Sequence, residues 1–286
     1  MVRREPGPIG GEGCVARFAA NLSRPAGNVT VRVLSYNIHK GIGGRDRRYS
    51  LERIIEVIEQ ANPDFICLQE VDRHVRRTRY HDQPNLLSRY FNAQGSLYQM
   101  NVHLKTGGYG NLLLSRWPIL EKHQVSLRLN WRKPRGAQMA IVETPEGPLH
   151  LVNWHLGLAE GERHWQVDHL LKHSLFCAQN HLPTLIVGDF NDWRNKLAKA
   201  RFLPMDFHCA TAPASRFRSF PAWLAMGALD KAFYRGPLNI KHAQIWKTPA
   251  SRIASDHLPL VIDFHLKDAV RAVEEIVSTE ATQASD

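Results

Sequence analysis

The stretch Thr184–Trp193 reads TLIVGDFNDW and joins an apolar run to a cluster of polar side chains. Its aliphatic and β-branched residues predict a buried strand that ends near Gly188. A carboxylate, an amide and a second carboxylate then follow within five positions, at Asp189, Asn191 and Asp192. Taken alone, an aspartate after a strand is more often a turn or capping residue. Several such groups at the end of a buried strand would be costly to remove from water. A functional site is therefore the alternative explanation.

The same arrangement recurs along the chain, and the recurrence favours a site. Other apolar segments also deliver an amide, a carboxylate or an imidazole to one end. These polar residues are Asn37, His39, Glu70, Asn153, His155, Asp230, Asp256 and His257. The ends of strands in α/β sheets are where sites are usually built, because the sheet holds the geometry while the loops admit a ligand.

The chain of 286 residues is expected to form one α/β domain over residues 29–266, built mostly from strands. Residues 1–28 are rich in Gly, Pro and Arg without periodicity and are interpreted as a flexible leader. Residues 267–286 are interpreted as a short helical tail that frays. No internal repeat and no linker-like composition interrupts the domain, so a second domain is not expected.

Two helices and a series of strands are predicted within this domain. Ser50 is expected to cap a helix that begins at Leu51. A longer helix is expected from about Ala159 to Gln179. Its inward-facing residues are expected to be Trp165, Leu170, Leu171 and Leu175. Strands are expected in the segments VRVLSYNI, DFICLQ, SLYQM, NLLLS, AQMAIVET, PLHLVNW, TLIVG, LDKAFY, NIKHAQIW and LPLVIDF.

The composition limits the class of protein and its partners. A net charge of +10 and a pI of about 9.7 favour anionic partners, such as nucleic acid, phosphorylated metabolites or acidic lipid headgroups, without ranking them. The four cysteines are scattered and form no CxxC pair, which is typical of a reduced, cytoplasmic protein. No apolar run is long enough for a transmembrane segment, and no signal peptide is recognisable. A monomer is expected.

The polar set suits a particular kind of metal chemistry. Glu70, Asn37 and Asp256 offer hard oxygen ligands, which suit Mg²⁺ or Mn²⁺ better than zinc. His155 and His257 can transfer protons or stabilise a phosphoryl oxygen. Carboxylates without a metal would repel an anionic substrate, whereas a bound cation reverses the sign of the site locally.

Seven motifs carry a family resemblance. In chain order NIHKG, LQEVD, GNLLLSR, NWHLGL, VGDFNDW, LDKAF and SDHLPL resemble the endonuclease/exonuclease/phosphatase superfamily over about residues 30–265. That superfamily includes pancreatic-type DNases, apurinic-site endonucleases, neutral sphingomyelinases and inositol-polyphosphate 5-phosphatases. The GDFN and SDHLP blocks are the most specific. The motifs HKG, HLGL and GDFNDW, with SFPAW and the following LD, are most similar to the bacterial YbhP-like branch.

The resemblance implies a fold and a metal site. The fold would be a four-layer α/β sandwich, with two packed mixed β-sheets flanked by helices. Glu70 would be the main metal carboxylate, Asn37 would lie beside it, and Asp256 would be a second carboxylate on the metal side. The cofactor would be Mg²⁺ or Mn²⁺, and Asn111 would bind the phosphate.

The resemblance also implies the catalytic roles. Asp189 and Asn191 would orient the attacking water and the scissile phosphate. His257, held by Asp230, would be the general base or the group that polarises the phosphate. His155 would contact the phosphate oxyanion from the opposite flank. Which residue takes the proton of the water stays open.

The leading interpretation is a metal-dependent hydrolase of phosphate esters, and a phosphodiesterase or nuclease acting on DNA or RNA is the first expectation. Hydrolysis of a phospholipid or phosphoinositide is the second, since the same site would permit it. A non-catalytic nucleic-acid-binding module is the alternative of another class. The complete set of polar residues argues against it, because binding alone does not require all of them.

Several weaker signals are weighed against structural explanations. His169 and His173 have the i, i+4 spacing of a zinc pair, but no HExxH motif accompanies them, so zinc is disfavoured. Lys231 follows the aspartate of LDKAF and is expected to point to solvent. Trp193 is interpreted either as a stacking platform or as a packing residue. A basic rim that attracts phosphate and a merely solvated face are equally compatible with Arg45, Arg47, Arg48, Arg73, Arg76, Arg77 and Arg79.

Overall fold

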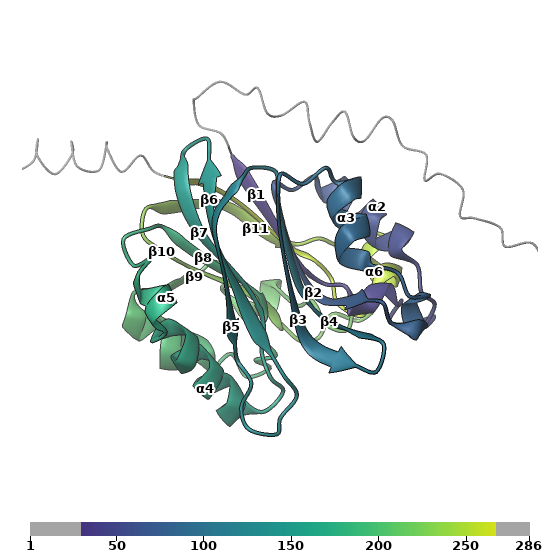
Figure 1. Cartoon of the computed structure of the whole chain (residues 1–286). Coiled ribbons are helices and arrows are strands. Elements are labelled where there is room, and N and C mark those ends of the chain that lie inside the picture. Colours follow the sequence, from purple (N-terminus) through teal and green to yellow (C-terminus); the bar gives the residue numbers. More distant parts are fainter. Residues whose placement is uncertain (1–29, 267–286) are drawn as a thin grey trace, which may run out of the picture.

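Two six-stranded sheets pack face to face and carry helices on their outer faces. The computed structural model describes residues 30–266, and Figure 1 shows the two sheets at the centre with helices on either side. The predicted four-layer α/β sandwich with mixed sheets is thereby confirmed. The proposed leader and the proposed tail lie outside the described residues.

The first sheet has the strand order β11-β12-β1-β2-β4-β3. Its strands β1 and β2 run parallel, and the other neighbours are antiparallel. The bounds are β1 Val31–Asn37, β2 Phe65–Arg73, β3 Gly95–Leu104, β4 Gly107–Ser115, β11 Leu238–Ile245 and β12 Leu260–Leu266.

The second sheet has the order β5-β6-β7-β8-β10-β9. Here β7 and β8 are the parallel pair. The bounds are β5 Ile119–Ser126, β6 Gly136–Thr144, β7 Gly147–His155, β8 Thr184–Asp189, β9 His208–Cys209 and β10 Asp230–Arg235. The parallel pair matters for function, because both of its strands end at the same edge of the sheet.

The helices divide between the two outer faces, as Figure 1 shows. Helices α2, Leu51–Ala61, α3, Gln83–Tyr90, and α6, Ser251–Ala254, lie beside the first sheet. Helices α4, Glu160–Leu171, and α5, Ser174–Cys177, cover the second sheet. Ser50 caps α2 as predicted, since its side chain accepts a hydrogen bond from the Arg53 amide at 3.4 Å.

The apolar strands are buried on both faces, which explains why they are continuous apolar runs. In β8, Leu185 and Val187 pack into the core between the sheets, while Ile186 packs toward the helices on the outer face. Successive side chains of a strand point to opposite faces, so a central strand of this sandwich needs apolar residues at every position.

The prediction of one long helix from Ala159 to Gln179 is wrong, because this segment forms two separate helices, α4 and α5. The side chain of His173 accepts a hydrogen bond from the Leu175 amide at 3.3 Å, which caps a new helix and interrupts the old one. Leu170 and Leu171 are buried as predicted, but Leu175 is exposed. The ring of Trp165 stacks on that of His169 at the surface, with 4.7 Å between centroids.

Candidate active site

Three neighbouring strands place three of the predicted residues in one row. His155 at the end of β7 lies opposite Asp189 at the end of β8, and Asp189 in turn lies opposite Asp230 at the start of β10. Strand β10 runs antiparallel to β8, so its first residue meets the last residue of β8. The sheet itself therefore positions these side chains, without help from a mobile loop.

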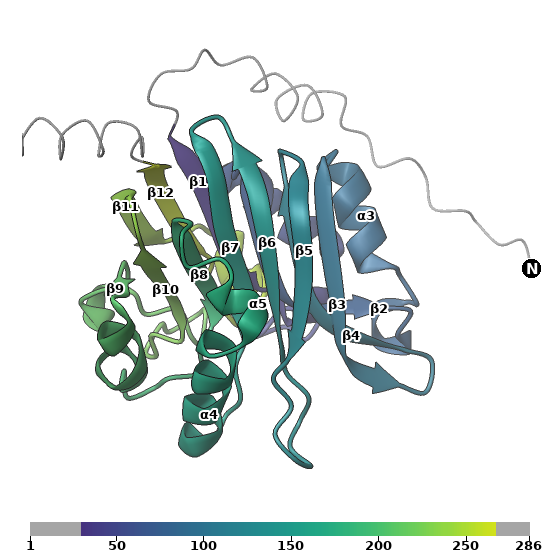
Figure 2. The same cartoon turned by 60° about the vertical axis from the view of Figure 1, so that its left-hand side comes forward.

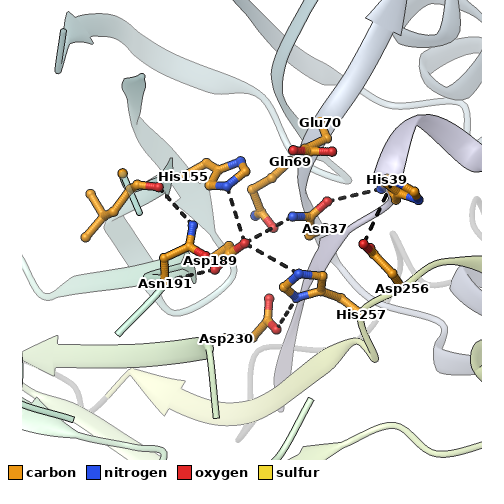
Figure 3. Close-up of polar contacts among 12 residues, drawn as sticks. Asn37, His39, Gln69, Glu70, His155, Asp189, Asn191, Asp230, Asp256 and His257 are labelled. Atoms are coloured by element: carbon orange, nitrogen blue, oxygen red, sulfur yellow. Dashed lines mark hydrogen bonds and ion pairs between the residues drawn. The ribbon is translucent and has the colours of Figure 1, made fainter. Parts of the chain in front are cut away.

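Asp189 is the centre of the cluster in Figure 3. Its Oδ2 atom accepts a hydrogen bond from Asn37 Nδ2 at 3.1 Å, and His155 Nε2 lies 3.3 Å away. His257 Nε2 lies 3.7 Å from the same oxygen. The other oxygen, Oδ1, accepts from the Asn191 amide at 2.9 Å. One carboxylate thus joins groups from both sheets.

Burial and neighbouring charges set the protonation of this cluster. Burial raises the pKa of Asp189, and the nearby carboxylate of Asp230 raises it further, to about 6. Burial would lower the pKa of His257, but the carboxylates of Asp230 and Asp189 outweigh it and raise the pKa. Asp230 Oδ2 lies 2.8 Å from His257 Nδ1. Burial and the charge of Arg135 hold the pKa of His155 well below its ordinary value.

Glu70 is aimed by an irregularity in β2. The pairing of β2 with β4 shifts register between Leu68 and Val71, and Glu70 has a φ of 58°. A bulge of this kind redirects a side chain and is frequent beside active sites. Although burial favours the neutral acid, the ammonium of Lys40, which contacts Glu70 Oε2, lowers the pKa of Glu70. Glu70 is therefore a carboxylate at neutral pH.

Asn37 and Asp256 lie on the same side of the site as Glu70. The main chain of His39 donates to Asn37 Oδ1 at 3.1 Å, and His39 Nε2 lies 3.9 Å from Asp256 Oδ2 (Figure 3). Ser255 donates from Oγ to the Asn37 carbonyl at 2.7 Å, which ties the strand end of β1 to the loop before β12. The serine holds the SDHLP segment against the end of β1.

A cavity of about 300 Å³ opens over this cluster. It is lined by seven of the nine predicted site residues, namely Asn37, Glu70, His155, Asp189, Asn191, Asp256 and His257. Asp230 lies behind His257, which it contacts. The lining also includes four cationic or amphipathic side chains that were not assigned to the site, His39, Lys40, Lys133 and Arg135. His39 and Lys40 belong to the NIHKG motif, and Lys133 and Arg135 belong to the basic run WRKPR, so these two segments could have indicated them.

Asn111, like Asp230, does not line the cavity, and unlike Asp230 it contacts none of the predicted site residues that do. Its side chain is buried, and Nδ2 donates to the Gly136 carbonyl at 3.0 Å. In this position the amide links β4 to β6 across the two sheets. Its assignment to the phosphate stays a prediction without geometric support.

A buried amide network lies beneath the site, and sequence reasoning missed it. Gln69 donates from Nε2 to Asn153 Oδ1 at 2.8 Å, and Asn153 donates from Nδ2 to Gln138 Oε1 at 2.9 Å. Gln138 continues to the Leu97 carbonyl at 2.6 Å. Buried hydrogen-bond networks of this kind favour one arrangement of the core. Here the network clamps the two sheets at the level where Asn37 and Asp189 meet.

The expectation that Lys231 points to solvent is wrong. Its side chain is buried, and Nζ donates to the Asp192 carbonyl at 3.2 Å and to Asn195 Oδ1 at 2.6 Å. It also donates to the Ala228 carbonyl at 2.5 Å. The first four residues of β10 are buried on both faces of the strand, so Lys231 does not face water. The ammonium instead satisfies carbonyl groups of the loop that carries Trp193.

The seven arginines are all exposed but differ in their ion-pair partners. Arg45, Arg47 and Arg48 are exposed. Arg77 is paired with the buried Asp72 at 2.7 Å, and Arg73 lies 3.3 Å from Asp82. Arg73 and Arg77 therefore have ion-pair partners within the fold, and the choice between a basic rim and a solvated face stays open.

The donor set can be compared with the needs of a divalent cation. Within residues 30–266, no three His, Cys, Asp or Glu side chains come together as a metal cluster, and this includes His169 and His173. Mg²⁺ usually takes one or two carboxylates and retains waters, so it does not need such a cluster. Glu70, Asn37 and Asp256 offer two carboxylates and an amide to one cavity. These residues fit a sparsely ligated Mg²⁺ or Mn²⁺ ion. The ion pair between Lys40 and Glu70 shows that this side of the cavity already accommodates a positive charge.

No helix among the described residues is long and apolar enough to span a membrane.

The sequence and the fold are similar to those of known proteins. The chain is 28% identical over 247 residues to the uncharacterised protein YbhP of Escherichia coli K12, and the match covers 82% of this chain and 96% of YbhP. The endonuclease/exonuclease/phosphatase of Beutenbergia cavernae superposes with a TM-score of 0.67 at 19% identity, over 83% of this chain and 72% of that one. The human nocturnin catalytic domain with bound sulfate superposes with a TM-score of 0.66 at 24% identity, over 83% and 95% of the two chains.

A model of the Endonuclease/Exonuclease/phosphatase family matches residues 34–257, which span every residue of the cluster around Asp189. The family and the YbhP-like branch indicated by the motifs are both confirmed. The chain belongs to the endonuclease/exonuclease/phosphatase family.

Proposed function

We propose that this protein is a divalent-metal-dependent phosphodiesterase that cleaves its substrate by in-line attack of water. The observation that carries the proposal is the position of Asp189, whose Oδ2 atom lies between Asn37, His155 and His257 at the floor of the cavity. The raised pKa of this carboxyl brings it closer to neutrality, where a general base is most effective. Family membership supports hydrolysis of a phosphate ester.

The roles of the side chains follow from their charges. His257 is held as an imidazolium by Asp230 and Asp189, so it donates a proton or a hydrogen bond to a phosphoryl oxygen rather than accepting one. His155 is neutral and approaches the same region from β7. Asp189 holds the attacking water and accepts its proton. Preorganised donors of this kind stabilise negative charge that gathers on the phosphoryl oxygens.

The metal would be held by Glu70, Asn37 and Asp256. When bound, a divalent cation balances phosphate charge and makes a coordinated water more acidic. Lys133 and Arg135 add positive charge to the cavity lining from the loop before β6. Together these residues allow an acidic cluster to accept an anionic substrate.

Nucleic acid is the first substrate class expected from the sequence, and a phospholipid or phosphoinositide is the second. The nocturnin catalytic domain, which has a similar fold, binds a sulfate anion, and this is compatible with an oxyanion site in this architecture. A non-catalytic binding module would not require a buried carboxylate with a raised pKa between two histidines.

The test is hydrolysis of bis-p-nitrophenyl phosphate with Mg²⁺ or Mn²⁺, with and without EDTA. Hydrolysis that requires the cation and disappears in Asp189→Asn supports the proposal. Full activity in excess EDTA, or no hydrolysis of this diester and of a panel of DNA, RNA and phospholipid substrates, would overturn it.

A further inference from the structure

Large apolar side chains surround the mouth of the active-site cavity and face water. We call Trp131, Leu158, Trp193, Trp223, Leu224 and Met226 the apolar rim. Trp131 is 90% exposed, Leu158 72%, and Leu224 and Met226 about 60% each. Soluble surfaces seldom gather apolar residues in this way without a partner. None of these side chains has a role in the hydrolysis proposed above.

One half of the rim is continuous with the active site. Leu158 and Trp193 line the catalytic cavity. Leu158 also lines a second hollow of about 330 Å³, which Trp131 lines as well. The two hollows share Lys133 and Arg135. The long loop between β5 and β6 carries Trp131, and Figure 2 shows this loop reaching beyond the ends of the strands.

The other half lies beside the metal-side residues. A methyl group placed at Gly44 would meet Trp223 Cζ3 at 2.8 Å and Asp256 Cα at 2.6 Å, so the Trp223 ring packs beside Asp256. A methyl group at Gly227 would meet Trp193 Cζ3 at 2.7 Å. The turn that ends at Gly227 also presents Leu224 and Met226. The apolar residues therefore stand on both sides of one cavity.

Basic residues accompany the rim. The loop of residues 127–135 reads LRLNWRKPR and holds four basic and no acidic residues. Arg45, Arg47 and Arg48 are exposed in the loop that begins at Gly43 and Gly44. A rim that is both apolar and cationic is complementary to a partner whose outer layer is negatively charged and whose interior is apolar.

We propose that the apolar rim docks this protein on the surface of an anionic phospholipid bilayer, with the catalytic cavity facing the headgroups. The inference deepens the proposed function and rests on it for the chemistry at the docked face. Tryptophan favours the boundary between headgroups and acyl chains, and leucine and methionine insert just below it. Nucleic acid fits less well, because Leu158, Leu224 and Met226 offer no flat face on which a base can stack.

The experiment is flotation of the full-length protein with vesicles, in EDTA so that no lipid is consumed. Vesicles of phosphatidylcholine alone are compared with vesicles that also contain phosphatidylglycerol. The double variant Trp131→Ala/Leu224→Ser alters the rim away from the catalytic cavity. The matched control is Leu120→Ser, which changes an exposed leucine at the opposite end of β5 from the Trp131 loop.

Wild type and the Leu120→Ser control should float with the phosphatidylglycerol vesicles, and the double variant should bind about tenfold more weakly. Quenching of tryptophan fluorescence by brominated lipid should accompany binding. Labelled single- and double-stranded oligonucleotides form a parallel arm at the same ionic strength. No flotation of the wild type, equal flotation of the double variant, or rim-dependent binding of oligonucleotides alone would overturn the inference. Hydrolysis of bis-p-nitrophenyl phosphate by the wild type tests the catalytic proposal separately.

Discussion

Asp230 Oδ2 lies 2.8 Å from His257 Nδ1, and both side chains are buried. The aspartate begins β10, while the histidine comes from the loop before β12 in the other sheet. This pair therefore orients an imidazole from one sheet with a carboxylate from the other. His257 Nε2 is left to face Asp189 and the cavity.

Asp230→Asn should lower turnover by about 10²-fold or more, because the imidazolium of His257 loses its main counter-charge. The pKa of His257 should fall, so imidazole NMR signals of His257 should titrate at lower pH than in the wild type. The control for the loss of an ion pair is Asp263→Asn. Asp263 lies on β12, and its Oδ1 atom is 2.6 Å from Arg32 Nε. A variant with an unchanged His257 titration would contradict this role.

Asp189→Asn should lose about 10²–10⁴-fold in turnover, since an amide cannot accept the proton of the attacking water. Substrate affinity should change far less, and in the direction of tighter binding, because one negative charge facing a phosphate is removed. The folded state should survive, as the substitution is nearly isosteric and removes a carboxyl whose ionisation is disfavoured by burial. Steady-state kinetics and thermal unfolding measure both effects. Turnover within a few-fold of wild type in a folded variant would reduce Asp189 to a structural residue.

Glu70→Gln should weaken binding of Mn²⁺ by about tenfold or more, because an amide oxygen carries no charge for the cation. Electron paramagnetic resonance of free Mn²⁺ during a titration measures this directly, without an activity assay. Glu52→Gln, in the first turn of α2, is the matched control. Identical titration curves for wild type and Glu70→Gln would exclude this carboxylate as a ligand.

Lys231→Met should destabilise the protein by about 1–3 kcal/mol, since buried oxygens of Asp192, Asn195 and Ala228 would lose their donor. Lys241→Met, at an exposed position of β11, should leave the free energy of unfolding close to that of wild type. Denaturant unfolding of the three proteins compares them. Equal loss in both variants would mean that the contacts of Lys231 add nothing specific.

The stability of the protein should depend on pH through His150. Burial is the main cause that lowers the pKa of His150 to about 4, and the charges of Arg235, His123 and His181 lower it further. The unfolded chain takes up this proton near pH 6.5, so stability is highest above that pH and falls as the pH drops toward 4. The loss is at most about 3 kcal/mol.

His150→Gln should flatten that pH dependence between about 6.5 and 4, because the glutamine side chain does not titrate. Unfolding measured across this range in wild type and variant isolates the contribution of His150. His208→Gln, at an exposed position of β9, controls for the loss of a histidine. A His150→Gln protein as sensitive to acid as the wild type would place the effect elsewhere.

Local sequence determined the strands and most of the polar residues at their ends. In TLIVGD the three consecutive residues Leu185, Ile186 and Val187 are apolar, and burial on both faces of a central strand requires such a continuous run. The order of the polar motifs was sufficient to indicate the family and its fold, which the match over residues 34–257 confirms.

Tertiary structure decided which of these residues meet, because strand register and sheet packing act between segments far apart in the chain. The antiparallel register of β10 with β8 sets Asp230 beside Asp189, and no local pattern specifies that pairing. Packing of the two sheets brings Asn37 to Asp189 and leaves Asn111 outside the cavity lining. Burial of both faces of β10 turns Lys231 inward, where an alternating pattern alone suggested solvent.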